Sequence, residues 1–326
     1  MMKTSKMPLI KWSGSKRRQA PYIVSQMLDE IDTYYECFLG GGSVLHELLN
    51  QIAAGTKKVK RIVCSDLNAD LINIWKAFVY DRQHLFDEYE KHYLNILERS
   101  ELKDGEEFSR EHVTKAQTYY YEMRNRMNSL SIDDPERATL FYWICRTCFN
   151  GLIRYNPKKG DSKHPYFNAS FHVGGRLGIR PDELQSVFES WGSVIDSFVN
   201  SGGEIVFIND SYIDVLKDAG KGDLIYMDPP YANTTGMYFC ETFDEDALWN
   251  ELRRLNAVGT RWMLSYDGKT GDDDRTADVP EDLYIRHEYV YAGHSSFKKL
   301  RSKSCDALQD KNKDVVKDSL YLNYHD

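Results

Sequence analysis

The sequence has 326 residues, a formal net charge of −8 at neutral pH and 41% hydrophobic residues, and its mean hydropathy is −0.58. This length suits one large domain or two moderate ones with an ample core. No run approaches the ~20 apolar residues that cross a bilayer, and the N-terminus lacks a secretory signal, so a cytoplasmic protein with no membrane partner is expected. The six scattered cysteines exclude a disulfide scaffold, and the cysteine and histidine spacings predict no metal site.

The first informative segment is a predicted strand at residues 34–39, followed by three glycines and a helical pattern at residues 44–49. A strand, a glycine turn and a helix bring the backbone close beneath a nucleotide-like ligand. The turn is not the dinucleotide fingerprint, because Leu45 stands at its last glycine position. A second strand at residues 61–65 ends at Asp66, and an acid at this point commonly binds ribose hydroxyls.

The middle of the chain, residues 79–195, has a mostly helical pattern with charged amphipathic stretches at residues 83–98 and 114–127. An irregular segment rich in glycine and asparagine follows at residues 150–178. A further helix opens at Pro181, since proline is favourable in the first turn. We therefore expect an α/β core formed by residues 1–78 and 196–326, interrupted by an insertion at residues 79–195.

Short apolar runs in the last third of the chain predict the remaining strands of the core. They lie at residues 205–208, 223–227, 262–265, 285–291 and 319–322. The first of these runs ends at Asn209 and Asp210, and the second ends at Asp228. Open α/β sheets bind their ligands at the carboxyl ends of the strands, so both acids are candidate site residues.

Asp228, Pro229, Pro230 and Tyr231 form the most informative motif of the chain. The prolines fix φ and lack an N–H, so the carbonyls around them are free to accept hydrogen bonds. A carboxylate, a fixed carbonyl and an aromatic ring suit an exocyclic amine on a planar base. The two acceptors would take the two N–H groups, and the ring would stack on the base. A rigid turn with an ordinary core tyrosine is the alternative for this motif taken alone.

The acidic net charge argues against a nucleic-acid partner, but the local distribution of basic residues argues for one. Basic residues gather at residues 11–18, 124–163 and 298–303, whereas acidic residues gather at residues 272–282. We expect the basic groups, Arg126 and Arg146 among them, to contact phosphates along a cleft. A solvated face is the alternative for each basic run taken alone.

Four motifs and their order resemble the Dam-type DNA adenine-N6 methyltransferases of the alpha group, also called the D12 class. They are residues 11–16 (KWSGSK), 36–43 (ECFLGGGS), 65–68 (SDLN) and 228–231 (DPPY), and residues 149–156 resemble a DNA-contacting segment of these enzymes. The resemblance implies a Rossmann-like class I methyltransferase core with a mostly helical DNA-recognition insertion. It also implies S-adenosylmethionine as methyl donor, no metal, and double-stranded DNA as substrate.

The resemblance also implies roles for single residues. Asp228 and the Pro229 carbonyl would accept from the adenine amine, and Tyr231 would stack on the flipped base. Asp210 would accept from the adenine amine of the cofactor, or would cap the following helix instead. The full set of implied cofactor contacts is Trp12, Lys16, Phe38, Gly40, Gly42, Asp66, Asp210 and Asp228. The implied DNA contacts are Lys11, the intercalating Phe149, Asn150, Leu152 and Arg154.

The expected target is GATC, although the chain departs from the family pattern with residues 157–166 inserted and Ser170 at the usual proline. We expect a monomer of bacterial or phage origin, with a cognate restriction endonuclease as a further partner. Methylation of cytosine N4 or of an RNA adenine, a nicotinamide-dependent oxidoreductase and a non-catalytic DNA-binding protein are the alternatives. Asp228 favours adenine in DNA, and the missing third glycine argues against the oxidoreductase.

Overall fold

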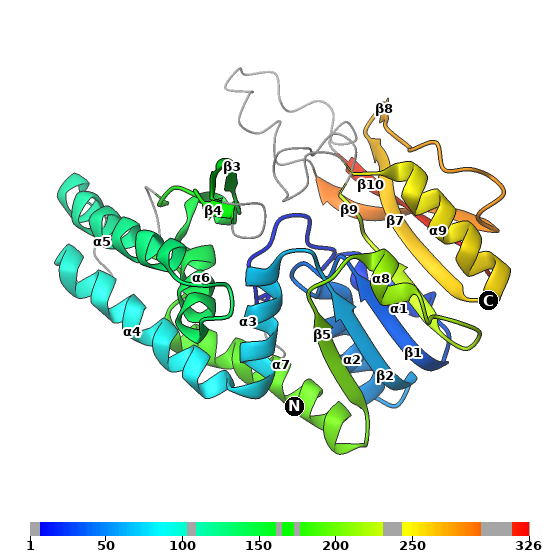
Figure 1. Cartoon of the computed structure of the whole chain (residues 1–326), viewed down its shortest axis with the longest axis horizontal. Helices are drawn as coiled ribbons and strands as arrows, with labels where there is room; N and C mark the ends of the chain where they lie inside the picture. The colour runs from blue at the N-terminus through cyan, green and yellow to red at the C-terminus, as the bar shows by residue number, and fades with distance from the viewer. Residues whose placement is uncertain are drawn as a thin grey trace.

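The computed structural model describes residues 7–102, 109–160, 165–172, 177–230, 243–294 and 315–325. A mostly parallel sheet lies at its centre, with the strand order β5-β2-β1-β6-β7-β10-β9 and β8 paired to β7 (Figure 1). The parallel strands are β1 (Glu30–Cys37), β2 (Lys58–Ser65), β5 (Glu204–Ile208), β6 (Leu224–Met227) and β7 (Arg261–Thr270). At the other end, β10 (Val315–Leu322) is antiparallel to both β7 and β9 (Arg286–His294), and β8 is Asp273–Asp274.

The strand order confirms the Rossmann-like core. Going outward from β1, the chain first builds β2 and β5 on one side and then crosses back to build β6 and β7 on the other. The point where the order reverses lies between β1 and β6, and open α/β sheets bind their ligands at such a point. The fold therefore places the candidate site at the carboxyl ends of these two strands.

Helices cover both faces of the sheet. Successive residues of a strand point to opposite faces, so neighbouring residues of the same strand pack into two different cores. In β1, Tyr34 packs into a core with α1 (Ala20–Ser25), α2 (Ser43–Ala53), α3 (Ala69–Tyr80) and α7 (Pro181–Asn200). Its neighbour Tyr35 packs into a second core with α8 (Tyr212–Leu216) and α9 (Glu245–Val258). Strands buried on both faces explain why the core strands read as near-continuous apolar runs.

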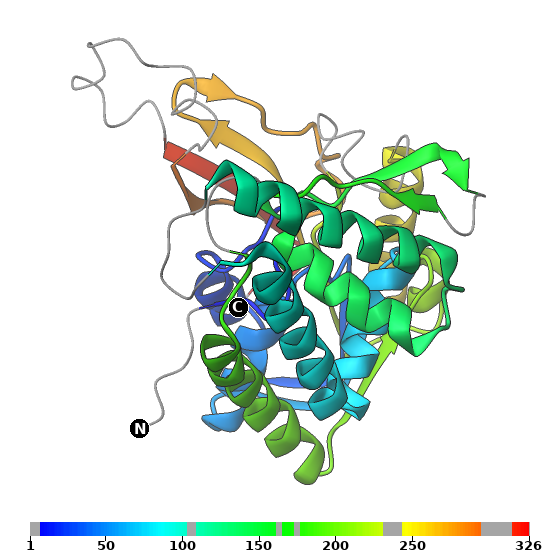
Figure 2. The same cartoon turned by 90° about the vertical axis from the view of Figure 1, so that its left-hand side faces the viewer.

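The remaining helices form a part of the molecule beside the sheet. They are α4 (Arg82–Ser100), α5 (Arg110–Ser129) and α6 (Pro135–Thr147), followed by the short 3-10 helix η1 (Phe149–Gly151). Figure 2, in which the left-hand side of Figure 1 faces the viewer, shows these helices in front of the sheet. The first hydrophobic core runs without interruption from the sheet helices into this helical part.

Residues 150–178, expected to be irregular, contain a small hairpin of β3 (Tyr155–Gly160) and β4 (Pro165–Phe167). Tyr155 pairs with Phe167 across the hairpin, and both rings pack near Phe141 of α6. Tertiary packing of these aromatic residues, rather than an alternating sequence pattern, therefore holds the hairpin in place.

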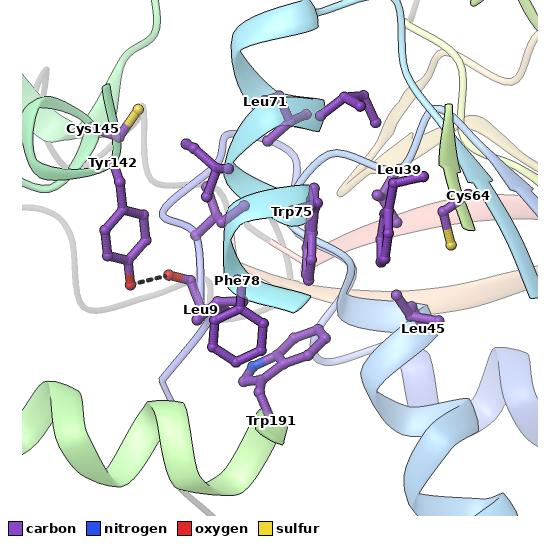
Figure 3. Close-up of a cluster of buried hydrophobic side chains, with 14 of the residues drawn as sticks. Leu9, Leu39, Leu45, Cys64, Leu71, Trp75, Phe78, Tyr142, Cys145 and Trp191 are labelled. Atoms are coloured by element: carbon purple, nitrogen blue, oxygen red, sulfur yellow. Dashed lines mark hydrogen bonds between the residues drawn. The ribbon is translucent and has the colours of Figure 1, made fainter. Parts of the chain in front are cut away.

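Side chains from distant segments meet where α3 contacts the helical part. Trp75 of α3 lies between the residues that follow β1 and Trp191 of α7, with Phe78 one turn further along (Figure 3). On the other side of the same cluster, the Tyr142 hydroxyl donates a hydrogen bond of 3.0 Å to the Leu9 carbonyl. The N-terminal segment is thus fixed to α6 by a buried hydrogen bond.

A buried ion pair joins the core to the helical part. Arg137 of α6 binds both carboxylate oxygens of Asp70 in α3, at 2.6 and 3.0 Å. The Tyr155 hydroxyl of the hairpin donates to the same carboxylate at 2.9 Å. Arg137 also donates to the carbonyls of Met127 and Leu130, so its charge is well matched despite its burial.

Replacing Arg137 with methionine should therefore destabilise the fold strongly, because the Asp70 carboxyl would remain buried without its cationic partner. We expect the free energy of unfolding to fall by about 3–5 kcal/mol in chemical denaturation. Arg99→Met is the matched control, since Arg99 makes a similar 2.8 Å pair with Glu122 on the exposed surface. The control should change stability little. Equal effects of the two substitutions would contradict the role of the buried pair.

Candidate active site

The predicted site residues follow strands that end side by side. The last residues of β5, β2, β1 and β6 are partners in register across the sheet. The residues that come directly after them are, in that order, Asn209, Asp66, Phe38 and Asp228. The sheet thus brings four separate motifs of the sequence to a single edge, which lies at the reversal of strand order.

The glycine turn after β1 has to be glycine-rich because aromatic rings occupy the space around it. Gly40 and Gly42 have φ of +50° and +63°. A Cβ on Gly42 would lie 2.7 Å from the Trp75 ring, and one on Gly40 would lie 3.0 Å from the Trp12 ring. The Trp75 indole also donates to the Gly40 carbonyl at 3.1 Å. The half-buried Trp12 therefore packs against the turn.

Asp66 ties the end of β2 to this turn. One of its oxygens accepts from the Gly40 N–H at 3.1 Å, and the other accepts from the Asn68 N–H at 2.9 Å. Burial raises the pKa of Asp66, against the lowering effect of these two hydrogen bonds. Each carboxylate oxygen can accept more than one hydrogen bond, so Asp66 keeps acceptor capacity for a ligand hydroxyl.

An aromatic wall lies next to these acids on the β5 side. The ring centroid of Phe38 is 5.3 Å from that of Tyr212 and 5.8 Å from that of Phe243. Asp210 is exposed beside them and accepts from the Ser211 N–H at 2.8 Å. The cap of α8 is Ser211, so the alternative role of Asp210 as a helix cap is wrong.

Lys16 lies between two carboxylates. Its ammonium is 2.9 Å from Asp228 and 3.4 Å from Asp318 of β10, and only 8% of the residue is exposed. Burial lowers the pKa of Lys16, but the two carboxylates outweigh burial and raise it above its ordinary value. The sequence predicted Lys16 as a cofactor contact. In the structure it pairs with the catalytic candidate and with Asp318, which the sequence did not predict as part of a site.

A buried glutamate stands behind the glycine turn. Glu36 of β1 accepts a 2.9 Å hydrogen bond from the Tyr34 hydroxyl and a further one from the Leu45 backbone of α2. Burial, together with the nearby charge of Asp228, raises the pKa of Glu36 to about 8. The presence of an acid within an apolar strand could have drawn attention to Glu36, but the motif at residues 36–43 gave this residue no role.

The predicted DNA contacts gather around η1. Phe149 and Leu152 are 45% and 41% exposed, and Arg154 is exposed beside them. The exposed Lys11 lies over Gly151, where a Cβ would be 2.7 Å from its side chain. Asn150 belongs to the same short helix, but its side chain lies outside the described residues, as do Tyr231 and the basic run at residues 298–303.

Two arginines expected to contact phosphate are engaged elsewhere. Arg146 is buried, stacks on Tyr142 and donates to the Pro8 carbonyl at 2.8 Å, so the prediction for it is wrong. Arg126 is exposed but pairs with Glu136 through two hydrogen bonds of 2.9 and 2.6 Å. Arg146 therefore anchors the N-terminal segment to α6.

Within the part of the chain that the structure describes, no group of three or more histidine, cysteine, aspartate or glutamate side chains could hold a metal ion. No helix among the same residues has the length and apolar character needed to cross a membrane.

The family model for the D12 class N6 adenine-specific DNA methyltransferases matches residues 12–303. The chain belongs to this family. This D12-class methyltransferase is therefore an adenine-specific enzyme acting on DNA, which removes the cytosine-N4, RNA, oxidoreductase and non-catalytic alternatives.

Similar proteins come from archaea, bacteria and phage. The type II methyltransferase M.MjaIII of Methanocaldococcus jannaschii is 27% identical, over 97% of this chain and 99% of its own length. The DNA N-6-adenine-methyltransferase of Escherichia phage P1 is 30% identical, over 77% of this chain and 28% of its own. The DNA adenine methylase of Haemophilus influenzae is 27% identical, over 69% of this chain and 64% of its own.

The raised pKa of Glu36 gives the methyltransferase a testable pH dependence. The folded state holds a proton on Glu36 that the unfolded state releases, so stability should fall as pH rises from about 5 to 8. Glu36→Gln cannot release this proton and should flatten the decline in the free energy of unfolding, measured with denaturant at each pH. Substitution of the exposed Glu98 by glutamine is the control and should leave the wild-type slope. An unchanged slope in Glu36→Gln would show that this carboxyl ionises normally.

Proposed function

We propose that the protein transfers a methyl group from S-adenosylmethionine to N6 of an adenine rotated out of duplex DNA. The observation that carries the proposal is the register match of Cys37 with Met227. It puts the glycine turn and the Asp228 loop on neighbouring strand ends, where a bound nucleoside and a reacting amine would meet. The reaction breaks a carbon–sulfur bond, forms a carbon–nitrogen bond and releases one proton from N6.

The catalytic roles follow from the electronic structure of adenine. The N6 lone pair is delocalised into the ring, so the amine is a poor nucleophile. Two acceptors on its hydrogens favour the pyramidal form, in which the lone pair is available. We assign these acceptors to the Asp228 carboxylate and the carbonyl of the buried Pro229. Tyr231 is proposed to stack on the flipped base.

The residues at the sheet edge fit S-adenosylmethionine by their chemistry. Asp66 offers acceptors for ribose hydroxyls, Phe38 an aromatic face for the purine, and the exposed Asp210 an acceptor for its amine. The first turn of α2 has neither a side-chain cap nor an acidic residue, which suits a ligand carboxylate near Gly40 and Gly42. When bound, this group supplies a methyl attached to a positively charged sulfur. Trp12, which packs against Gly40, and Lys16, which pairs with Asp228, would be the remaining cofactor contacts.

An adenine inside a duplex cannot reach the sheet edge, so the base must leave the stack. We propose that residues 79–195 recognise the target through the helical part formed by α4, α5, α6 and η1, since α7 packs against the sheet, and that Phe149 fills the gap left by the flipped base. Leu152 offers a second apolar contact, and Lys11, Asn150 and Arg154 would read base edges. The exposure of Phe149 and Leu152 supports this role, because both side chains are accessible to a DNA duplex.

We further propose GATC as the target, a monomer as the active form, and the cytoplasm of a bacterial or phage-infected cell as the location. Three of the similar proteins carry type II methyltransferase names, which supports a cognate restriction endonuclease as a functional partner.

The direct test is to incubate the protein with labelled S-adenosylmethionine and duplex DNA and to identify the methylated nucleoside after digestion. N6-methyladenine is the expected product. Asp228→Ala should reduce the single-turnover rate by at least 10²-fold, as expected for a loss of about 3 kcal/mol of preorganised stabilisation. DNA binding should persist. Asp246→Ala, an exposed acid of α9, is the control. A rate within a few-fold of wild type would remove Asp228 from its role.

Arg154 tests the origin of sequence specificity. If it reads a guanine edge, Arg154→Ala should cost about 1–3 kcal/mol of discrimination at a single position and relax the motif there. Methylation profiling on a mixed-sequence substrate measures this directly. Arg180→Ala, which removes an exposed arginine paired with Asp182, should leave the motif intact. Uniformly lower activity with an unchanged motif would show that Arg154 binds phosphate instead.

A further inference from the structure

The catalytic candidate Asp228 shares its ammonium partner with a second acid. Lys16 is 2.9 Å from Asp228 and 3.4 Å from Asp318, and the Gln19 amide donates to Asp318 at 2.9 Å. Asp318 comes from β10, close to the end of the chain, and Lys16 from the N-terminal segment. Segments about 300 residues apart thus meet beside the reacting group.

The sheet has a local irregularity where Asp318 lies. The register of β10 against β7 shifts between Lys317 and Ser319, so Asp318 pairs with Val290 of β9 but has no register partner in β7. Opposite the shift lies Gly268, where an added Cβ would be 2.1 Å from the Lys317 carbonyl. Irregular pairing of this kind redirects a side chain and commonly occurs beside active sites.

The charges of this cluster have a clear consequence. Lys16 and Asp228 alone would form a neutral pair, which would offer little attraction to a cationic ligand. With Asp318, these three side chains comprise two carboxylates and one ammonium, an excess of one negative charge among them. Two neighbouring acids do not reduce this negative charge. Glu36 has a pKa of about 8, and burial raises the pKa of Asp267 on β7, so each is neutral when protonated and adds negative charge when ionised.

We propose that Asp318 is a positioning residue that offsets the charge of Lys16, so that Asp228 faces the methyl donor and the methylated amine with net negative charge. The inference rests on the proposed function of this site. Lys16 fixes the orientation of the Asp228 carboxylate, and Asp318 holds Lys16 without letting its charge cancel that of Asp228. The catalytic contact itself stays with Asp228.

This role predicts a selective loss of affinity for a positively charged ligand. S-adenosylmethionine carries a sulfonium, whereas its product S-adenosylhomocysteine has a neutral sulfur and almost the same shape. In Asp318→Asn, the affinity for S-adenosylmethionine measured by titration calorimetry should fall about tenfold, as expected for the loss of one nearby charge. The affinity for S-adenosylhomocysteine should change less than twofold. A purely structural role would weaken both ligands equally and would overturn the proposal.

Asp29→Asn is the matched control. Asp29 also pairs with a buried lysine, Lys57 at 2.8 Å, but it precedes β1 and lies at the opposite edge of the sheet. It should leave the ratio of the two affinities unchanged. A change in this ratio as large as that in Asp318→Asn would overturn the proposal, because the effect would not depend on proximity to Asp228.

A double substitution separates charge from folding. Lys16→Met with Asp318→Asn leaves Asp228 as the negative group of the cluster and removes a lysine that would otherwise lack one of its partners. The charge balance predicts that the ratio of the affinities for S-adenosylmethionine and S-adenosylhomocysteine in this variant returns to the wild-type value. This comparison can be made even if the single variant Asp318→Asn is too unstable to measure. Failure to recover it in a protein with a cooperative thermal transition would overturn the proposal. Absence of N6-methyladenine with the wild-type protein would instead refute the proposed function.

Discussion

The position of Trp75 beneath the glycine turn is the constraint on which the arrangement at the sheet edge depends. Its indole fills the space that a side chain on Gly42 would need and donates to the Gly40 carbonyl. The same ring stacks on Phe207 of β5 at 5.5 Å and contacts Trp191 of α7 at 5.1 Å. One side chain therefore fixes the turn after β1, the face of β5 and the position of α7 together, and dense packing transmits any change among them.

Helix α3 connects this turn to the helical part of the molecule, which we propose to bind DNA. Asp70, near its beginning, is held by Arg137 of α6 and by Tyr155 of the hairpin, while Trp75 lies about one turn further along. The hairpin and the glycine turn are thus both attached to one short rigid element. The two hydrogen bonds of 2.6 and 3.0 Å between Arg137 and Asp70 fix the orientation of α6 against α3.

Local patterns were enough to predict the seven longer strands of the central sheet, their order in the chain and the polar residues at their ends. Apolar runs mark buried strands, and a parallel sheet necessarily aligns the residues at their carboxyl ends. Asp318 and Glu36 could not be assigned in this way, because their surroundings come from segments remote in sequence. The hairpin after η1 was missed because tertiary contacts of Tyr155 and Phe167 hold it, and Arg146 was misplaced because a surface charge and a buried anchor look alike in a sequence.

The N-terminal segment connects the proposed recognition surface to the proposed catalytic acid. Its Leu9 carbonyl is bonded to Tyr142 of α6, Lys11 covers Gly151 of η1, and five residues later Lys16 reaches Asp228. The proposed recognition surface around η1 is therefore attached to residues that lie outside the insertion. A chimera that imports α6 and η1 from another member must import a matching segment around residues 8–11 as well. Exchange of the insertion alone would combine α6 and η1 of one protein with the N-terminal segment of another, and these contacts would no longer match.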